Sequence, residues 1–178
     1  PIRVSDSLLT KLSDLQYVTK VSRFASKPGI IKTDSAFQGI VFKGTDYWDY
    51  FAQNLVAGCL PEKPNEVLVS EELALSLSLK LDDPILCYFI EEDLRVRRFY
   101  ISGLYRTCMT EMDKLFVLGD IEVVRRLNGW EQNQVSGIEV LVDDLRHLGE
   151  ASDAVYFATA NRLDEEGNAF YTQNLQQL

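Results

Sequence analysis

The chain has one histidine, three cysteines and no long apolar run, and each scarcity excludes a class of function. A general base needs a nucleophile within hydrogen-bond reach, and the sequence suggests none near His147. No P-loop, GxSxG, HExxH or EF-hand pattern occurs either. No stretch approaches the roughly 20 apolar residues that span a bilayer. The sequence therefore predicts a non-enzyme without a cofactor or a metal.

The cysteines do not indicate a metal site. Cys59, Cys87 and Cys108 are odd in number and form no CxxC pair, which excludes a zinc ribbon. Free cysteines are commonly buried, so we expect three small buried side chains. A hairpin of strands 85–90 and 96–105 is expected to bring Cys87 near Tyr100. Because a disulfide needs Cα atoms within about 7 Å, this register predicts three free thiols.

Positive charge is also in short supply. The 18 basic residues are outnumbered by 27 acidic ones, so the formal net charge is −9. A nucleic-acid surface needs clustered Lys and Arg, so nucleic acid is not an expected partner, and an anionic membrane surface is disfavoured too. The densest acidic groups, 91–93 and 143–144, lack the spacing of a calcium loop. They are interpreted as a solvated turn and a helix cap.

What the chain does have is a folding composition, with 46% hydrophobic residues over 178 positions. Capping residues and apolar spacing predict the helices, and β-branched alternation predicts the strands. The expected helices cover 8–15, 71–77, 121–127 and 145–158. The expected strands cover 18–32, 37–43, 66–69, 85–90, 96–105, 115–118, 135–142 and 169–175. This succession is typical of a mixed α+β fold.

An aromatic segment is the first candidate contact surface. Tyr47 and Trp48 are followed closely by Tyr50 and Phe51. An exposed aromatic patch can bind a partner. The alternative is inward packing, because Trp48, Phe51 and Leu55 fit one face of a helix.

A charged hairpin tip is the second candidate. Glu91, Glu92, Asp93 and Arg95 lie between two expected strands. Such a tip is either a solvated turn or a small charged contact point for a partner protein, where rim charges tune the association rate.

Several motifs in succession carry a resemblance to a known family. They are NEVLVSEELA at 65–74, LKLDD at 79–83, RFYISGL at 98–104, LFVLGDI at 115–121 and VSGIEV at 135–140. In this order and spacing they resemble the periplasmic, MacB-like core domain of FtsX-like ABC-transporter permeases. The resemblance covers nearly the whole chain and is nearest to the lipoprotein-releasing type of Bacteroidetes.

The resemblance implies a split architecture. Residues 1–61 and 134–178 would form a membrane-proximal lobe of two βα-type halves, and 62–133 would form an inserted, small β-rich lobe. Strands 37–43, 135–142 and 169–175 would then share one sheet, covered by helices 8–15 and 145–158. We also expect the two ends of the chain to be cuts next to membrane helices of a longer protein.

The resemblance also implies a function. The chain would be the periplasmic, non-catalytic domain of an inner-membrane permease, and it would transmit motion driven by an ATPase that is a separate subunit or domain. Its contacts would be with a periplasmic or outer-membrane-directed protein or lipoprotein cargo. The alternative is an extracytoplasmic ligand-binding or sensor domain of another membrane protein.

Two departures from the family pattern bear on that function. Asp82-Asp83-Pro84 stands where the family has Gly-Asp, and an Asp tolerates the left-handed backbone of such a turn. Relatives that capture a soluble chaperone have a long loop where this chain has only 91–95. A connection of hairpin length is too short to hook a partner, so chaperone capture is not expected.

Overall fold

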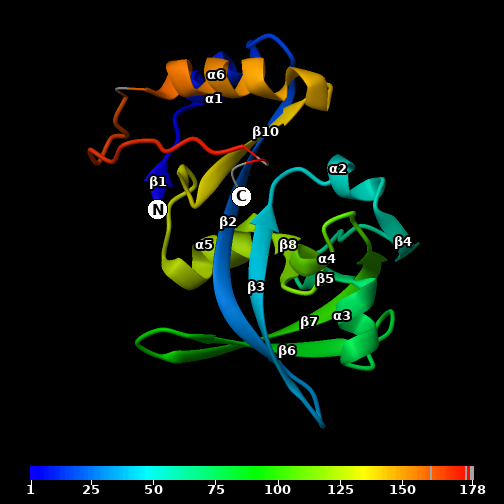
Figure 1. Ribbon diagram of the computed structural model, residues 1–178. Helices are drawn as coiled ribbons and strands as arrows, with labels where there is room; N and C mark the ends of the chain where they lie inside the picture. Colours follow the sequence, from blue (N-terminus) through cyan, green and yellow to red (C-terminus); the bar gives the residue numbers. More distant parts are fainter. Residues whose placement is uncertain (161, 175, 177–178) are drawn as a thin grey trace. The chain divides into compact units, whose positions relative to one another are not determined.

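The computed structural model describes residues 1–160, 162–174 and 176, and the mixed α+β class expected from the sequence is confirmed (Figure 1). The chain forms two compact units. Unit 1 comprises Pro1–Arg23 and the chain from Trp130 onward, and unit 2 comprises Phe24–Gly129. The long strand β2 (Val18–Lys32) runs from the first unit into the second.

Unit 2 is built on a ring of paired strands. β2 pairs with β3 (Phe37–Thr45), which lies parallel to β8 (Phe116–Asp120). β8 neighbours β5 (Glu66–Ser70), which lies parallel to β7 (Leu94–Tyr105).

Strand β6 (Pro84–Ile90) closes this path, because it pairs with both β7 and β2. Strand β4 (Leu55–Gly58) is added along the inner end of β7. The contact between β6 and β2 is limited to Leu86–Tyr88 on β6. The outer ends of β6 and β7 therefore extend past the ring as a hairpin.

The core of unit 2 is aromatic at its centre. The Phe42 ring packs edge-on against Phe89, with ring centroids 6.0 Å apart, and tilted against Phe99 at 5.0 Å. All three side chains are buried. Gly119 lies so close that a Cβ there would approach Phe42 Cζ to 2.2 Å. A glycine on β8 thus makes room for the ring on β3.

The helices of unit 2 begin and end as their capping residues predict. Ser70 Oγ accepts from Leu73 N (3.0 Å) at the start of α3 (Glu71–Ser76). Asp120 caps α5 (Ile121–Asn128), and Gly129 ends it with φ of 66° in the left-handed region that glycine tolerates. Two shorter helices, α2 (Asp49–Ala52) and α4 (Thr110–Asp113), complete the unit.

Unit 1 packs two helices around a small apolar cluster. Leu8 and Leu12 of α1 (Asp6–Ser13) contact Ala158 of α6 (Leu148–Thr159), which follows a short 3-10 turn, η1 (Leu145–His147). β1 (Ile2–Arg3) pairs with β9 (Gln134–Val135), and β10 (Gly137–Val142) neighbours β2. None of the helices among the described residues has the length and apolar character needed to cross a membrane.

The units have other bounds than the lobes expected at 1–61 plus 134–178 and 62–133. Both chain ends do share one unit, but residues 24–61 cluster with 62–129. The reason is strand pairing: β3 binds β8 in parallel and β4 binds β7, which ties this early segment to the later one. The expected strand 37–43 therefore lies in unit 2. It still belongs to the same eight-stranded sheet as β10, as expected, because both strands neighbour β2.

Two expected strands of the terminal segment also differ. The strand expected over 135–142 is interrupted at Ser136, giving β9 and β10. The strand expected over 169–175 does not form in its described part, where Ala169 makes an isolated bridge to Leu163; residue 175 lies outside the described residues.

The thiols are free, as expected, but their environments differ. Cys87 is buried, and burial raises the pKa of its thiol to about 12, whereas Cys59 and Cys108 are exposed. The predicted burial is therefore wrong for two of the three. The register of the β6–β7 hairpin also differs from the expected one, which put Cys87 near Tyr100. Cys87 instead faces Arg97, and Tyr100 faces Pro84.

Candidate partner-binding site at the β6–β7 hairpin

The charged tip predicted from the sequence is a tight turn between two strands. Ile90 pairs with Leu94, so the turn consists of Glu91, Glu92 and Asp93. Arg95 belongs to β7 and not to the turn. The connection is thus even shorter than the five residues expected.

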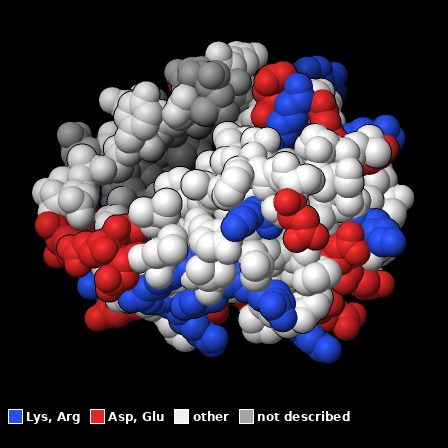
Figure 2. Space-filling model, turned by 90° about the horizontal axis from the view of Figure 1, so that it is seen from below, with Lys and Arg blue, Asp and Glu red and all other residues white. Residues whose placement is uncertain are grey.

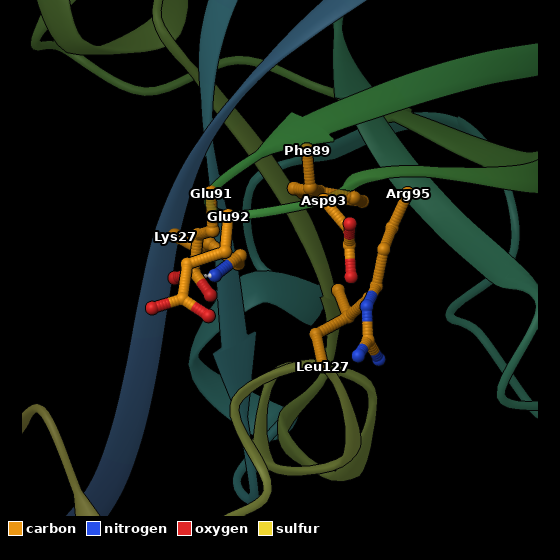
Figure 3. A pocket seen from close by; sticks show the side chains of 7 residues that line it. All are labelled: Lys27, Phe89, Glu91, Glu92, Asp93, Arg95 and Leu127. Atoms are coloured by element: carbon orange, nitrogen blue, oxygen red, sulfur yellow. Dashed lines mark hydrogen bonds and ion pairs between the residues drawn. The ribbon is translucent and has the colours of Figure 1, made fainter.

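All four candidate tip residues line one pocket in unit 2. The pocket has a volume of about 360 Å³ (Figure 3). It is lined by Lys27, Phe89, Glu91, Glu92, Asp93, Arg95 and Leu127. In the close-up, Lys27 reaches towards the acidic residues from β2, and Arg95 extends from β7 towards Leu127 of α5. The fold therefore brings the tip together with Lys27 and Leu127, which are far from it in the sequence.

Lys27 is the buried anchor of this pocket. Its side chain is 6% exposed, and its ammonium donates to the Glu91 carboxylate and to Asn128 Oδ1 (2.7 Å). The Glu91 side chain remains 59% exposed. A buried ammonium is costly unless paired and hydrogen-bonded. Glu91 and Asn128 meet that need, so the hairpin tip is held to β2 and to the end of α5.

Sequence reasoning missed Lys27, although alternation along β2 contained the signal. Side chains at alternate positions of a strand share a face, and Ala25, Lys27 and Ile31 are all buried. Gly29 continues the same face, where an added Cβ would lie 3.1 Å from the Phe89 ring. The absence of a side chain at this position lets β6 bring Phe89 under the tip.

The aromatic candidates lie elsewhere in unit 2. Trp48 packs with Phe51 at 6.0 Å between ring centroids, against a core cluster that includes Leu68. Tyr47 is half-buried beside Thr45, whose hydroxyl accepts from Tyr47 N (3.1 Å). Phe51 is buried, whereas the Tyr50 side chain is 45% exposed, so the segment packs inward only in part. None of its residues lines the pocket at the tip.

His147 is the only histidine and sits in unit 1. Its Nδ1 lies 2.9 Å from Asp143 Oδ1, and its ring stacks on Tyr17 with centroids 3.9 Å apart. The hydrogen bond to Asp143 is the main reason that the pKa of His147 is raised above 6.5. The residue is the N-cap of α6 without a side-chain hydrogen bond to the helix, and neither of its contacts is with a nucleophile.

The raised pKa of His147 predicts a pH-dependent contribution to stability. A group whose pKa is raised on folding stabilises the fold fully below its unfolded pKa, and this stability is lost as pH rises through the folded pKa. His147→Gln should therefore destabilise unit 1 more at about pH 5.5 than at about pH 8.5, as measured by urea unfolding. An equal loss at both pH values would contradict the assignment of the Asp143 contact.

No cluster of three or more His, Cys, Asp or Glu side chains with the geometry of a metal site occurs among the described residues. At the tip, the carboxylate of Glu91 is already engaged by Lys27. The tip thus presents the exposed carboxylates of Glu92 and Asp93 beside the ion pair of Lys27 and Glu91.

Comparison with known proteins assigns the fold. No family model matches the chain. The chain has the fold of the extracytoplasmic domains of ABC-type transporter permeases. It resembles the extracellular domain of the noncanonic ABC-type transporter YknZ from Gram-positive bacteria, with a TM-score of 0.61 and 13% identity over 96% of this chain and 91% of that one.

Two further structures have the same fold. The periplasmic region of MacB from Actinobacillus actinomycetemcomitans gives a TM-score of 0.58 at 16% identity, covering 88% of this chain and 75% of that one. A domain of a putative permease protein from Porphyromonas gingivalis gives 0.55 at 14% identity, covering 93% and 73%. At these identities the likeness establishes the fold alone.

One curated relative matches in sequence. The chain is 27% identical over 128 residues to the lipoprotein-releasing system transmembrane protein LolC of Xylella fastidiosa (strain 9a5c). The match covers 65% of this chain and 30% of that protein. The chain thus spans about a third of the length of this relative.

Proposed function

We propose that this chain is a non-catalytic extracytoplasmic domain of an FtsX-like ABC-transporter permease. The observation that carries the proposal is the fold shared with the YknZ domain over almost the full length of both chains. The sequence match to LolC also supports a permease domain, and it makes lipoprotein release the process that we favour. In this role the domain transmits motion driven by an ATPase subunit to the outer side of the membrane. It is anchored in the inner membrane by segments outside this chain.

The proposed contact point for a cargo or periplasmic partner is the hairpin tip. Glu92 and Asp93 are exposed, and Lys27 holds the neighbouring Glu91 in place. Because the turn is so short, this tip supports a charged rim contact rather than the encircling capture of a chaperone. Its charges act mainly on the rate of association and on the salt dependence of that rate.

The pocket at the tip is the feature that speaks for a second candidate function, a ligand-binding or sensor domain. A volume of about 360 Å³ is at the lower end of the range for small-molecule sites, which begins at roughly 300 Å³. The buried ammonium of Lys27, the cation that a ligand would meet there, is already paired with Glu91. These features support a small-ligand site less well than they support a surface for protein contact.

Thiol labelling tests the proposed location. In cells that make the full-length protein, a membrane-impermeant maleimide should modify Cys59 and Cys108, which are exposed, and spare buried Cys87. Denaturation before labelling should make all three react. The double variant Cys59→Ser/Cys108→Ser should lose the labelling that these two thiols contribute in intact cells. Labelling that requires lysis of the cells would place the domain in the cytoplasm and refute the proposal.

Charge reversal tests the tip. A photo-crosslinking residue at Ile90 of the full-length protein should form an adduct with an extracytoplasmic protein, and Glu92→Lys/Asp93→Lys should reduce the adduct several-fold at low salt. Glu91 stays unchanged because it neutralises Lys27. The matched control, Glu62→Lys/Asp153→Lys, makes the same charge change at two exposed positions outside residues 91–95. Equal adduct yields in both variants would remove the tip from the proposal.

A further inference from the structure

The outer part of β7 has an open edge. On one side, β6 pairs with β7 from Leu94 to Tyr100. On the other side, β5 pairs with β7 only from Tyr100 onward. Within the described part of the chain, no strand pairs with residues 94–99 on the β5 side. A strand edge of this length can accept a further strand.

Backbone hydrogen bonds at the inner end of β7 define the direction of each peptide group. Tyr100 N donates to Asn65 O (2.8 Å), which lies on the β5 side. Ile101 N donates to Asp83 O (3.1 Å), on the β6 side. Proline at position 84 agrees with this pattern, since it faces Tyr100 and has no N–H to donate.

The same alternation extends to the outer end. The register between β6 and β7 is unbroken from Tyr100 to Leu94, and successive residues of a strand direct their N–H and C=O groups to opposite sides. Leu94, Val96 and Arg98 therefore direct their backbone groups to the open edge. In keeping with this, Val96 O accepts from the Arg97 guanidinium (3.0 Å), a side-chain contact in place of a strand partner.

The open edge is exposed and locally basic. Every residue from 94 to 98 is exposed, including the apolar Leu94 at 59% and Val96 at 40%. Arg95, Arg97 and Arg98 put three cations on this edge of a chain whose net charge is −9. In the view from below, basic side chains gather along one stretch of the surface and acidic side chains adjoin it (Figure 2).

We propose that this edge binds an extended acidic segment of a partner protein by strand addition. The backbone groups of Leu94, Val96 and Arg98 supply the ladder, and the arginines pair with acidic side chains of the added strand. The apolar side chains contact the residues between those acids. This inference does not require the transporter role, and it concerns a surface beside the tip rather than the tip itself.

A second copy of the chain is disfavoured as the occupant. Edge-to-edge pairing of two β7 strands would set arginines of one copy against arginines of the other, and like charges across a strand pair are destabilising. The same arginines protect the free edge from self-association. An acidic strand removes this repulsion, so charge selects the partner.

The test uses the 178-residue chain and a capped peptide of alternating glutamate and valine. Amide exchange followed by NMR should show new protection at Leu94, Val96 and Arg98 when the peptide is added. The amides of Arg95 and Arg97, which face β6, should change little. A peptide with lysine in place of glutamate should not bind.

Two substitutions at one position isolate the backbone contribution. Val96→Pro removes an N–H that faces the open edge and should weaken peptide binding by about tenfold or more, because Pro is tolerated on an edge but cannot donate. Val96→Ala keeps the N–H and should weaken binding by less than about threefold. Unchanged protection of Cys87 and Phe99 amides would show that both variants keep the β6–β7 hairpin.

Three results would overturn the inference. The first is no binding of the acidic peptide at low salt. The second is binding without the alternating pattern of protection, which would mean contact through side chains only. The third is protection of the same amides in the free chain as its concentration rises, which would make a second copy the occupant. None of these results would bear on thiol accessibility in intact cells, so the proposed function is tested separately.

Discussion

Phe42→Ala is expected to lower the free energy of unfolding of unit 2 by about 3–5 kcal/mol. The Phe42 side chain is fully buried, and its ring contacts Phe89 and Phe99 from the hairpin strands. Gly119, which lies against the ring, has no side chain that could fill the space left by Phe42. Removal of the ring therefore creates a cavity at the centre of the strand ring, and urea unfolding of the chain measures the loss.

Phe37→Ala is the matched control for this substitution. The Phe37 side chain is 73% exposed, so the same change should alter the unfolding free energy by less than about 0.5 kcal/mol. Equal losses for the two variants would contradict the placement of Phe42 at the centre of the core.

Glu91→Ala is expected to lower the free energy of unfolding by about 1–3 kcal/mol, although the Glu91 side chain is itself largely exposed. The cost arises at Lys27, whose buried ammonium would keep only Asn128 as a partner. Glu92→Ala, one residue away, removes an exposed carboxylate without this role and should change stability by less than about 0.5 kcal/mol. Equilibrium unfolding of both variants gives the comparison.

The reverse substitution completes the argument about the ion pair. Lys27→Met replaces the buried cation with an apolar side chain of similar length and should change stability by less than about 1.5 kcal/mol. In a variant that already carries Lys27→Met, Glu91→Ala should then leave the free energy of unfolding almost unchanged. If Glu91→Ala is equally costly with and without Lys27, the ion pair does not hold the tip.

Much of the local structure was predictable from short-range chemistry. Ser70 and Asp120 begin helices where their side chains bond the first free N–H groups, and Gly129 ends one at a positive φ. The β6–β7 hairpin followed from β-branched and aromatic runs on either side of three acidic residues. These features depend on neighbours within a few positions, which a sequence displays directly.

The features that depend on distant pairing were less accessible. Nothing in residues 37–45 indicates that β3 pairs in parallel with β8, yet this pairing moves the segment into unit 2. The strand predicted near Ala169 does not form in the described residues, because an alternating pattern does not show whether another strand is available to pair with it. Likewise, Cys59 and Cys108 proved exposed because residue type sets only an average tendency to be buried.

The candidate site shows the same division. Glu91, Glu92, Asp93 and Arg95 were identified from their charges and do line one pocket. The pairing of Glu91 with Lys27 joins positions 64 residues apart and was not visible in the local pattern. The open edge of β7 depends on where β5 stops, which only the register of the two strands reveals.

Purification of the full-length protein from detergent-solubilised membranes tests the central proposal most directly. The ATPase of an ABC transporter acts through the membrane part of the permease, so the purified protein should hydrolyse ATP through a P-loop subunit or domain present in fixed proportion. The tagged 178-residue chain alone, which contains no P-loop, should show no such activity and bring down no such subunit. Full-length protein that carries no ATPase, or that copurifies with a kinase of a signalling system, would contradict the account and favour a sensor domain.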